Sequence, residues 1–206
     1  MKPVLLREGF EAPGYENEGW VETVDIGCAL VPGFAAESPD KGSYVLKAHS
    51  LNDDSEYAYA TYTLEGVTNQ LTNKVSAYIR LVDHGLSNSQ QVYAIALCTS
   101  SGADVAVVQY YFTNYELNLM FRCLSAGQWI YHEVIPVTTD WYLVDFDYDI
   151  EKFRYKFKLN NKTYFKGDID PEIWVPQSIK KVKAGIFRNF SNAPATLQVA
   201  SVEWDD

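Results

Sequence analysis

The sequence has too few basic residues for a protein that binds nucleic acid by charge, and it has no apolar run long enough to span a membrane. Seventeen Lys and Arg stand against 27 Asp and Glu among 206 residues, a formal net charge of −10. Such an acidic chain lacks the electrostatic attraction that holds proteins to nucleic acid or to anionic membranes. No stretch approaches the roughly 18 to 20 apolar residues of a membrane-spanning helix. We therefore expect no nucleic acid partner and no membrane span.

Cysteine is also scarce, and the beginning of the chain lacks an export signal. Cys28, Cys98 and Cys123 are an odd number and show neither CxxC pairs nor zinc-binding spacing. This pattern favours reduced, mostly buried thiols in a reducing compartment. Arg7 follows only a short apolar segment, where a signal peptide needs roughly 7 to 15 apolar residues. We expect synthesis in the cytoplasm without a signal peptide.

Aromatic residues and alternating hydrophobicity are abundant instead. Fifteen Tyr, ten Phe and five Trp make 15% of the chain, and from residue 43 onward apolar and polar residues alternate with the period of a half-buried strand. The predicted strands lie at residues 43–49, 55–64, 75–81, 91–98, 104–113, 115–122, 128–135, 141–148, 153–160, 162–167, 180–188 and 195–204. Only residues 171–176 favour a helical turn. The pattern predicts one all-β domain over residues 1–206, a two-sheet antiparallel sandwich.

Two of these strands, at residues 91–98 and 104–113, are apolar on both faces. A strand of this kind belongs in the middle of a layered structure, because both of its faces must be covered. We therefore expect a second covering layer over this part of the sandwich, from a long loop or from a partner.

The segment 141–160 predicts a hairpin with a definite register. The pairs expected on its apolar face are Tyr148–Phe153, Phe146–Tyr155, Val144–Phe157 and Tyr142–Leu159. On its other face, Asp147 lies opposite Arg154 and Asp145 lies opposite Lys156. A slip of one residue would turn the whole apolar set to the wrong face, so the pattern favours this pairing over its immediate neighbours.

Several segments together resemble the concanavalin A-like lectin/glucanase superfamily, which includes laminin-G-like modules. The matching segments are residues 7–11 with Gly19-Trp20, residues 74–81, the hairpin from Trp141 to Asn160, and the closing strand at residues 197–204. The resemblance implies a jelly roll in which the first and last strands are neighbours, with Phe10 and Val202 in the core. It implies no activity by itself, because this fold hosts lectins, hydrolases, lyases and structural modules.

Asp145, Asp147 and Asp149 are the sharpest catalytic candidates. Glucanases of the superfamily carry a Glu-x-Asp-x-Glu pattern on one strand, where alternate carboxylates share a face. This chain has only the shorter Asp side chains, and Asp149 falls in the predicted turn. Arg154 and Lys156 on the opposite strand would keep the carboxylates ionised, so that no proton donor forms. The sequence therefore predicts surface ion pairs here.

Other catalytic arrangements are not found either. His49, His84 and His132 have no Ser or Cys nucleophile motif near them. Lyases of this fold class need a cluster of Arg, Gln, His and Tyr, and no run of the sequence supplies one. We expect His84 to be exposed and the other two histidines to be structural. The sequence predicts no catalytic residues and a protein that is not an enzyme.

Metal binding has weak support. The segments 52–56 and 168–172 are rich in side-chain oxygen, which calcium prefers, but neither follows the EF-hand spacing. Solvated turns are the simpler interpretation. We expect no metal site and no cofactor, and leave calcium open.

Rings beside polar side chains are the best indication of a binding function. Sugars stack on Trp and Tyr while neighbouring polar groups fix their orientation. Trp129 and Tyr131 follow a tight turn, with Gln128 beside them and Arg122 on the neighbouring segment. We predict that these four residues bind carbohydrate.

The preferred function is a non-catalytic binding or structural module of a virus particle, such as a phage capsid decoration, fibre or tail-associated protein. Release with a particle would bring a lectin-like fold outside the cell without an export signal. Its partners would be capsid or tail proteins and surface glycans. The alternatives are a free carbohydrate-binding module and, third, a glycoside hydrolase or polysaccharide lyase.

Overall fold

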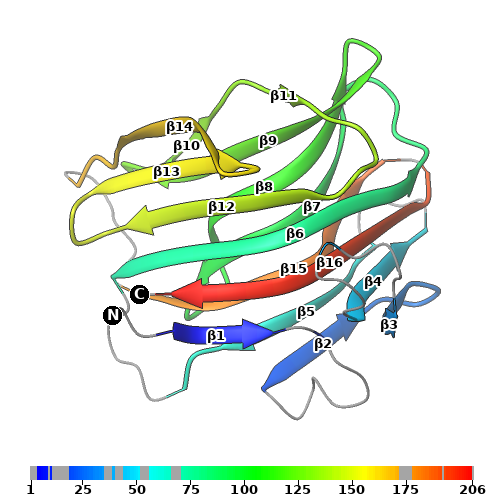
Figure 1. Cartoon of the computed structure of the whole chain (residues 1–206), viewed down its shortest axis with the longest axis horizontal. Helices are drawn as coiled ribbons and strands as arrows, with labels where there is room; N and C mark the ends of the chain where they lie inside the picture. Colours follow the sequence, from blue (N-terminus) through cyan, green and yellow to red (C-terminus); the bar gives the residue numbers. More distant parts are fainter. Residues whose placement is uncertain are drawn as a thin grey trace.

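The computed structural model confirms an all-β fold. It describes residues 4–8, 10, 19–34, 39, 44–51, 56–65, 71–171, 178–191 and 193–205. These residues form sixteen strands and no helix, and therefore contain no helix long and apolar enough to cross a membrane. The strands make two antiparallel sheets that pack face to face (Figure 1). The helical turn expected at residues 171–176 lies almost wholly outside the described residues.

One layer, sheet A, contains the last strand of the chain near its centre. Its order is β14 (Lys162–Asp168), β13 (Arg154–Leu159), β12 (Tyr142–Asp149), β6 (Thr72–His84), β16 (Ala195–Asp205), β4 (Tyr44–Ser50) and β3 (Ala29–Phe34). The first strand, β1 (Val4–Glu8), also pairs with β16. The expectation that the first and last strands are neighbours is confirmed (Figure 1).

The other layer, sheet B, contains the strands that are apolar on both faces. Its order is β10 (Gln128–Tyr131), β9 (Glu116–Ser125), β8 (Asp104–Thr113), β7 (Gln90–Thr99), β15 (Ile179–Phe190), β5 (Ala58–Thr63) and β2 (Trp20–Val24), and β11 (Ile135–Pro136) pairs with β9. Residues 92–98 of β7 and 105–110 of β8 are buried without interruption. Both strands are flanked on each side by others, as their composition predicts.

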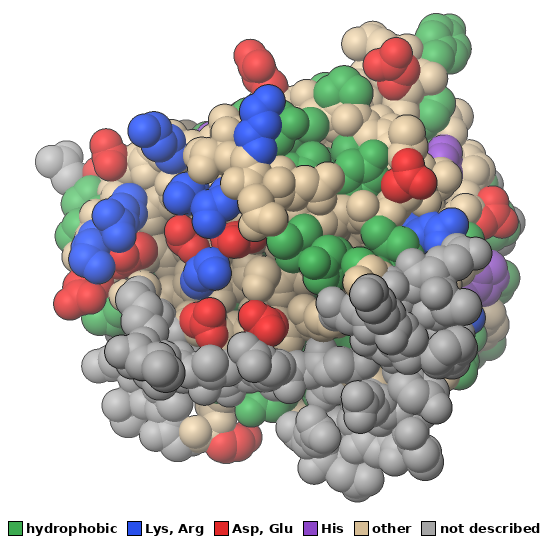
Figure 2. Space-filling view, in the orientation of Figure 1, with side chains coloured by type: hydrophobic (Ala, Val, Ile, Leu, Met, Phe, Trp, Pro, Cys, Tyr) green, Lys and Arg blue, Asp and Glu red, His purple; other side chains and the backbone are tan. Residues whose placement is uncertain are grey.

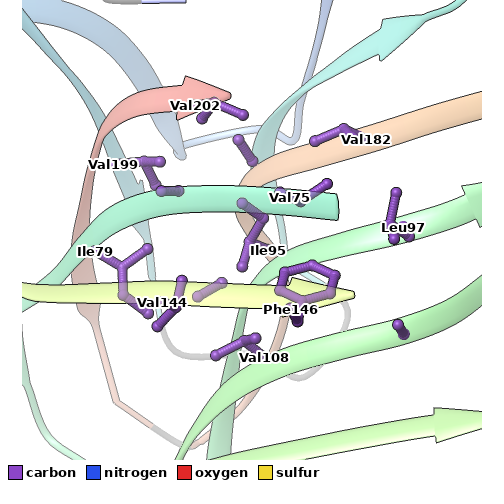
Figure 3. Close-up of a cluster of buried hydrophobic side chains, with 14 of the residues drawn as sticks. Val75, Ile79, Ile95, Leu97, Val108, Val144, Phe146, Val182, Val199 and Val202 are labelled. Carbon is purple, nitrogen blue, oxygen red and sulfur yellow. The ribbon is translucent and has the colours of Figure 1, made fainter. Parts of the chain in front are cut away.

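The core lies between the two sheets. Figure 3 shows a part of it, where the sheet A residues Val75, Ile79, Val144, Phe146, Val199 and Val202 meet the sheet B residues Ile95, Leu97, Val108 and Val182. Each fully buried side chain of this size stabilises the fold by about 1.5–3 kcal/mol relative to an exposed one. Phe10 and Val202 are fully buried, which confirms their predicted place in the core. Cys98 and Cys123 are buried free thiols and Cys28 is a half-buried one.

The β12–β13 hairpin exists, but its predicted register is wrong by two residues. The observed pairs include Val144–Leu159, Phe146–Phe157 and Tyr148–Tyr155. The turn explains the difference: Ile150 is buried, and the backbone N–H of Lys152 donates to Asp149 Oδ1 at 2.8 Å. Phe153 has a positive φ of 49° and lies outside the strand. Because the shift is even, every residue keeps its predicted face.

Candidate functional site

A cluster of aromatic rings lies on the outer face of sheet B, around Arg122 of β9. The turn between β9 and β10 creates it, because Ala126 and Gly127 both have positive φ, 51° and 70°, as a tight two-residue hairpin turn requires. β10 then pairs with β9 so that Tyr131 lies directly opposite Arg122. Trp129, two residues before Tyr131, shares its face.

The guanidinium group of Arg122 is enclosed by these rings. Its Cζ atom lies 4.2 Å from the ring centroid of Trp129, 4.5 Å from that of Tyr93 on β7 and 5.7 Å from that of Tyr131. Arg122 Nη1 donates to the Tyr131 hydroxyl at 3.5 Å. The residue is only 7% exposed, and its Nε atom is buried without a hydrogen-bond partner. Cation–π contacts stabilise such a desolvated cation by about 2 kcal/mol.

Polar side chains from β7, β8 and β15 extend the cluster across the sheet. Gln109 of β8 lies opposite Tyr93, and Arg188 of β15 lies opposite Tyr93 on the other side. Gln109 Nε2 donates to Gln91 Oε1 at 2.5 Å, whereas Gln109 Oε1 is buried without a partner. Arg188 is exposed, with its Cζ atom 5.8 Å from the Tyr93 ring centroid. Tyr93 therefore lies between two cations.

The face around the cluster is positively charged although the chain as a whole is acidic. Lys183 of β15 pairs with Asp104 of β8, with 2.8 Å between Nζ and Oδ1. The register of β15 against β7 and β8 also places Lys181 on this face, opposite Cys98. Arg122, Lys181, Lys183 and Arg188 thus share this face with Asp104, and Glu116 lies exposed at the start of β9. A face with more cations than carboxylates favours an anionic ligand over a cationic one.

A bulge in β15 positions the remaining rings. The pairing of β15 with β7 shifts between Ala184 and Arg188, and Gly185 in this interval has a φ of +112°. A Cβ atom on Gly185 would lie 2.7 Å from the backbone oxygen of Ala58, so the close approach requires glycine. Beyond the bulge, Phe187 and Phe190 pack edge-on against Tyr93, at 5.6 and 5.5 Å between centroids.

The structure brings three of the four predicted sugar-binding residues together. Arg122, Trp129 and Tyr131 are in contact, whereas Gln128 is exposed at the turn, opposite Ser125. Sugar binding by these residues stays a prediction. Sequence reasoning missed Tyr93 and Arg188, which reach this face from other strands. The apolar outer face of residues 91–98 was the available signal. Side chains of sheet B itself, among them Phe187, Trp129 and Phe190, pack over this face, and a covering loop or partner stays a prediction.

The acidic triplet lies on the outer face of sheet A. Asp145 and Asp149 are ion-paired there, but they are buried rather than at the surface as predicted, with 6% and 3% of each residue exposed. Asp145 Oδ2 lies 3.4 Å from Lys158 Nζ and 3.7 Å from Lys74 Nζ. Lys158, not the predicted Lys156, lies opposite Asp145, because the hairpin register differs by two residues. Asp149 Oδ2 lies 3.5 Å from both Lys152 Nζ and Arg154 Nε.

Asp147, the middle member, differs from its neighbours. It makes no ion pair with the described residues, and its Oδ1 atom is buried without a hydrogen-bond partner. The residue directly opposite is Lys156, not the predicted Arg154. Burial raises the pKa of the Asp147 carboxyl group, and the negative charge of Asp145 adds to this effect.

None of the three histidines is among the side chains that contact Arg122. His49 Nδ1 and Thr196 Oγ1 form a hydrogen bond of 3.0 Å, and His132 stacks on Phe165 at 4.6 Å between centroids, which agrees with structural roles. His84 is half-buried rather than exposed, because its ring packs near Phe112 at 6.0 Å. Burial lowers the pKa of both His84 and His132.

The two oxygen-rich segments lie only partly within the described residues. The described part of the chain contains no group of three or more His, Cys, Asp or Glu side chains placed to hold a metal ion. Residues 52–55 of the first segment, and residue 172 of the second, lie outside the described residues. Whether the protein binds calcium stays open.

Comparison with known proteins relates this architecture to carbohydrate-active folds. No family model and no curated protein sequence matches the chain. Among solved structures, an endo-β-1,4-glucuronan lyase from the fungus Trichoderma reesei matches with a TM-score of 0.67 and 9% identity, over 98% of this chain and 95% of that chain. A conserved carbohydrate esterase of bacteriophage phi24B matches with a TM-score of 0.66 and 12% identity, over the whole of both chains.

A sialidase also matches, with a TM-score of 0.65 and 11% identity over 97% of this chain. The present chain spans only 18% of the length of that sialidase. At identities of this size, the three likenesses establish the fold.

The prediction that the protein is not an enzyme is contradicted by this comparison. The lyase and the esterase are enzymes, and their chains match this fold almost from end to end. The prediction rested on a search for a cluster of Arg, Gln, His and Tyr within single runs of sequence. The Arg, Gln and Tyr side chains on the outer face of sheet B come instead from β7, β8, β9 and β10. With two stacked antiparallel sheets and these structural neighbours, the chain is a jelly-roll sandwich of the concanavalin A-like type.

Proposed function

We propose that this protein is a carbohydrate-active enzyme that binds an acidic polysaccharide on the outer face of sheet B and cleaves it by β-elimination. The observation that carries the proposal is Arg122. Its guanidinium group is almost fully buried among three rings and pairs with no carboxylate of the described residues. A buried, unpaired cation is costly in water-poor surroundings, and an anionic ligand relieves that cost.

The surrounding side chains suit an acidic sugar in particular. Trp129 and Tyr131 offer ring faces on which a pyranose can stack. Arg122 and Arg188 lie on either side of Tyr93, so a uronate carboxylate bound over Tyr93 would meet both cations. The fold of the glucuronan lyase supports the same class of substrate.

β-Elimination requires cations that stabilise the charge on the carboxyl group, an acceptor for the proton that leaves, and a donor for the leaving oxygen. The outer face of sheet B offers candidate groups for these requirements. A proton leaves the carbon next to the uronate carboxyl group, and the bond to the neighbouring glycosidic oxygen breaks. The negative charge that builds up on the carboxyl group needs fixed cations, which Arg122 and Arg188 supply. The proton needs an acceptor and the leaving oxygen needs a donor. Tyr131 is the candidate for proton transfer, because its hydroxyl contacts Arg122 and its side chain is exposed.

The experiment incubates the protein with polyglucuronate, alginate and polygalacturonate and follows the ultraviolet absorbance of the unsaturated uronate product. We expect Arg122→Gln and Tyr131→Phe to lower the rate by at least about 100-fold. Tyr164→Phe, a surface tyrosine on the other sheet, is the matched control and keeps full activity. Activity on none of the polysaccharides, or full activity in Tyr131→Phe, would contradict the proposal. Binding without cleavage would contradict the catalytic part.

We further propose that the enzyme acts from a virus particle, with capsid, fibre or tail proteins as partners and host-surface polysaccharide as substrate. The phage esterase, which matches this fold over the full length of both chains, supports this setting. Peptides of the protein should be found by mass spectrometry in particles purified from a lysate. Their presence only in the soluble fraction would contradict the proposal.

A further inference from the structure

A pocket of about 440 Å³ opens on the outer face of sheet A, in the layer opposite the Arg122 cluster. Its volume falls within the roughly 300 to 1,000 Å³ of small-molecule sites. The residues that line it come from β12, β13 and β14: Asp147, Arg154, Tyr155, Lys156, Lys166, Gly167 and Asp168. Figure 2 shows Lys, Arg, Asp and Glu side chains gathered at the left of this face, over the same end of the sheet.

The strand register explains why charged groups meet in the pocket. Asp147 lies opposite Lys156, and Lys156 lies opposite Lys166, so the three form one row across the three strands. Residues directly opposite each other in a sheet share a face. Arg154 and Asp168 form part of the next row. The pocket therefore carries three cations and two carboxylates.

Three of these groups make no ion pair within contact distance in the described part of the chain. Arg154 is engaged with Asp149, but neither Lys156 nor Lys166 makes an ion pair there. Asp147 Oδ1 is a buried acceptor without a hydrogen bond. Buried acceptors of this kind are rare in folded proteins, because leaving them unpaired costs about 1–3 kcal/mol. The pocket thus presents two free cations beside one unsatisfied oxygen.

Gly167 contributes to the shape of the pocket. A Cβ atom at this position would lie 2.5 Å from the Tyr155 hydroxyl oxygen, so the phenol occupies the space that a side chain would take. Burial also raises the pKa of Asp147, because the ionised carboxylate loses solvation in the pocket, and the charges of Lys74, Lys156 and Lys158 offset part of this cost. A ligand that donates a hydrogen bond to this carboxylate relieves that cost.

We propose that this pocket is a second saccharide site, which binds one acidic sugar unit with its carboxylate on Lys156 and Lys166 and a hydroxyl group on Asp147. A simple oxyanion such as phosphate fits less well, because it brings only acceptors toward the carboxylates of Asp147 and Asp168. A neutral sugar leaves both lysines unpaired. The site needs neither the Arg122 cluster nor any catalytic step, and it gives a polysaccharide a second contact on the opposite layer.

Titration of the full chain by NMR tests the proposal, with glucuronic acid, galacturonic acid, glucose and inorganic phosphate as probes. We expect at least one uronic acid to shift the amide signals of Lys156, Lys166 and Gly167, and to bind at least about tenfold more tightly than glucose or phosphate. Equal binding of phosphate, or absence of shifts at these amides with both uronic acids, overturns the proposal.

Variants separate this site from the one on sheet B. Lys156→Gln combined with Lys166→Gln should weaken uronic acid binding at least about tenfold, and so should Asp147→Ala. Lys162→Gln, an exposed lysine on β14 outside the pocket, is the matched control and leaves the affinity unchanged. Arg122→Gln should leave these amide shifts intact even if it abolishes polysaccharide cleavage. Unchanged affinity in the double lysine variant overturns the proposal.

Discussion

Arg122 is stacked on Trp129, with 4.2 Å between its Cζ atom and the ring centroid. Trp129 shields the cation from water, and under the proposed function it also presents a ring to the acidic sugar. We expect Trp129→Ala to weaken binding of an acidic oligosaccharide by about 3- to 10-fold, whereas Trp129→Phe keeps most of the affinity because a ring remains. Isothermal titration calorimetry measures both. If the alanine variant binds as tightly as the unmodified protein, Trp129 does not contact the ligand.

His132 should make the protein less stable in mild acid. The imidazole is stacked between Phe121 and Phe165, and burial lowers its pKa from the ordinary 6.5. The unfolded chain therefore takes up the proton first, so the free energy of unfolding falls as the pH drops below 6.5, until the pH reaches the lowered pKa of the folded state. His132→Phe should reduce this slope in urea denaturation measured across that window. Because His84 shifts in the same direction, some slope should remain.

Asp145 and Asp147 should respond in opposite ways to the same substitution. Asp145 is paired with Lys74 and Lys158, so Asp145→Asn should lower the free energy of unfolding by about 1 kcal/mol at neutral pH. Asp147 has a raised pKa and an unsatisfied oxygen, so Asp147→Asn should increase stability at neutral pH.

The pH dependence checks the second half of this prediction. A raised pKa in the folded state means that folding favours the protonated carboxyl group, so the advantage of Asp147→Asn should shrink as the pH falls toward the ordinary value of 3.8. Thermal unfolding of both variants at several pH values is the measurement. Destabilisation by Asp147→Asn at neutral pH would mean that this carboxylate already has a favourable partner.

The bulge at Gly185 should tolerate no side chain. Gly185→Ala places a Cβ atom 2.7 Å from Ala58 O at a φ of +112°, and we expect a loss of about 2–4 kcal/mol. Gly102 is the matched control, because its φ is +88° but nothing lies within 4 Å of an added Cβ atom. Gly102→Ala should cost only about 1–2 kcal/mol, from the backbone conformation alone. If urea denaturation gives similar losses of unfolding free energy for the two variants, the backbone near Ala58 shifts to accommodate the added Cβ atom.

The fold could be predicted from the sequence because strand alternation is a local signal. Residues 104–113 form β8 with the bounds predicted, and the residues of β12 take the faces predicted. The hairpin register could not be predicted, because the choice between pairing partners two residues apart depends on how the turn packs Ile150. β2 was missed because it is mainly exposed, and β3 because Pro32 and Gly33 interrupt its alternation.

Only the part of the candidate site that lies within one hairpin could be predicted from the sequence. Arg122, Trp129 and Tyr131 belong to one hairpin, so a tight turn and strand alternation bring them together. Tyr93, Gln109 and Arg188 reach the same face through pairings between distant segments, which a single sequence does not reveal. The pocket on sheet A was missed for a related reason, since the wrong register set Arg154 rather than Lys156 opposite Asp147.

The two-residue difference in the β12–β13 hairpin also bears on how the protein folds. A slip of two residues leaves the rings on the core face and the charges on the outer face. Hydrophobic burial alone therefore favours the native register only weakly over the alternative that pairs Tyr148 with Phe153. The contacts that mark the native register lie in the turn, where Ile150 is buried and the backbone N–H of Lys152 donates to Asp149 Oδ1. Substitutions in this turn should therefore favour the slipped register more than substitutions along the two strands.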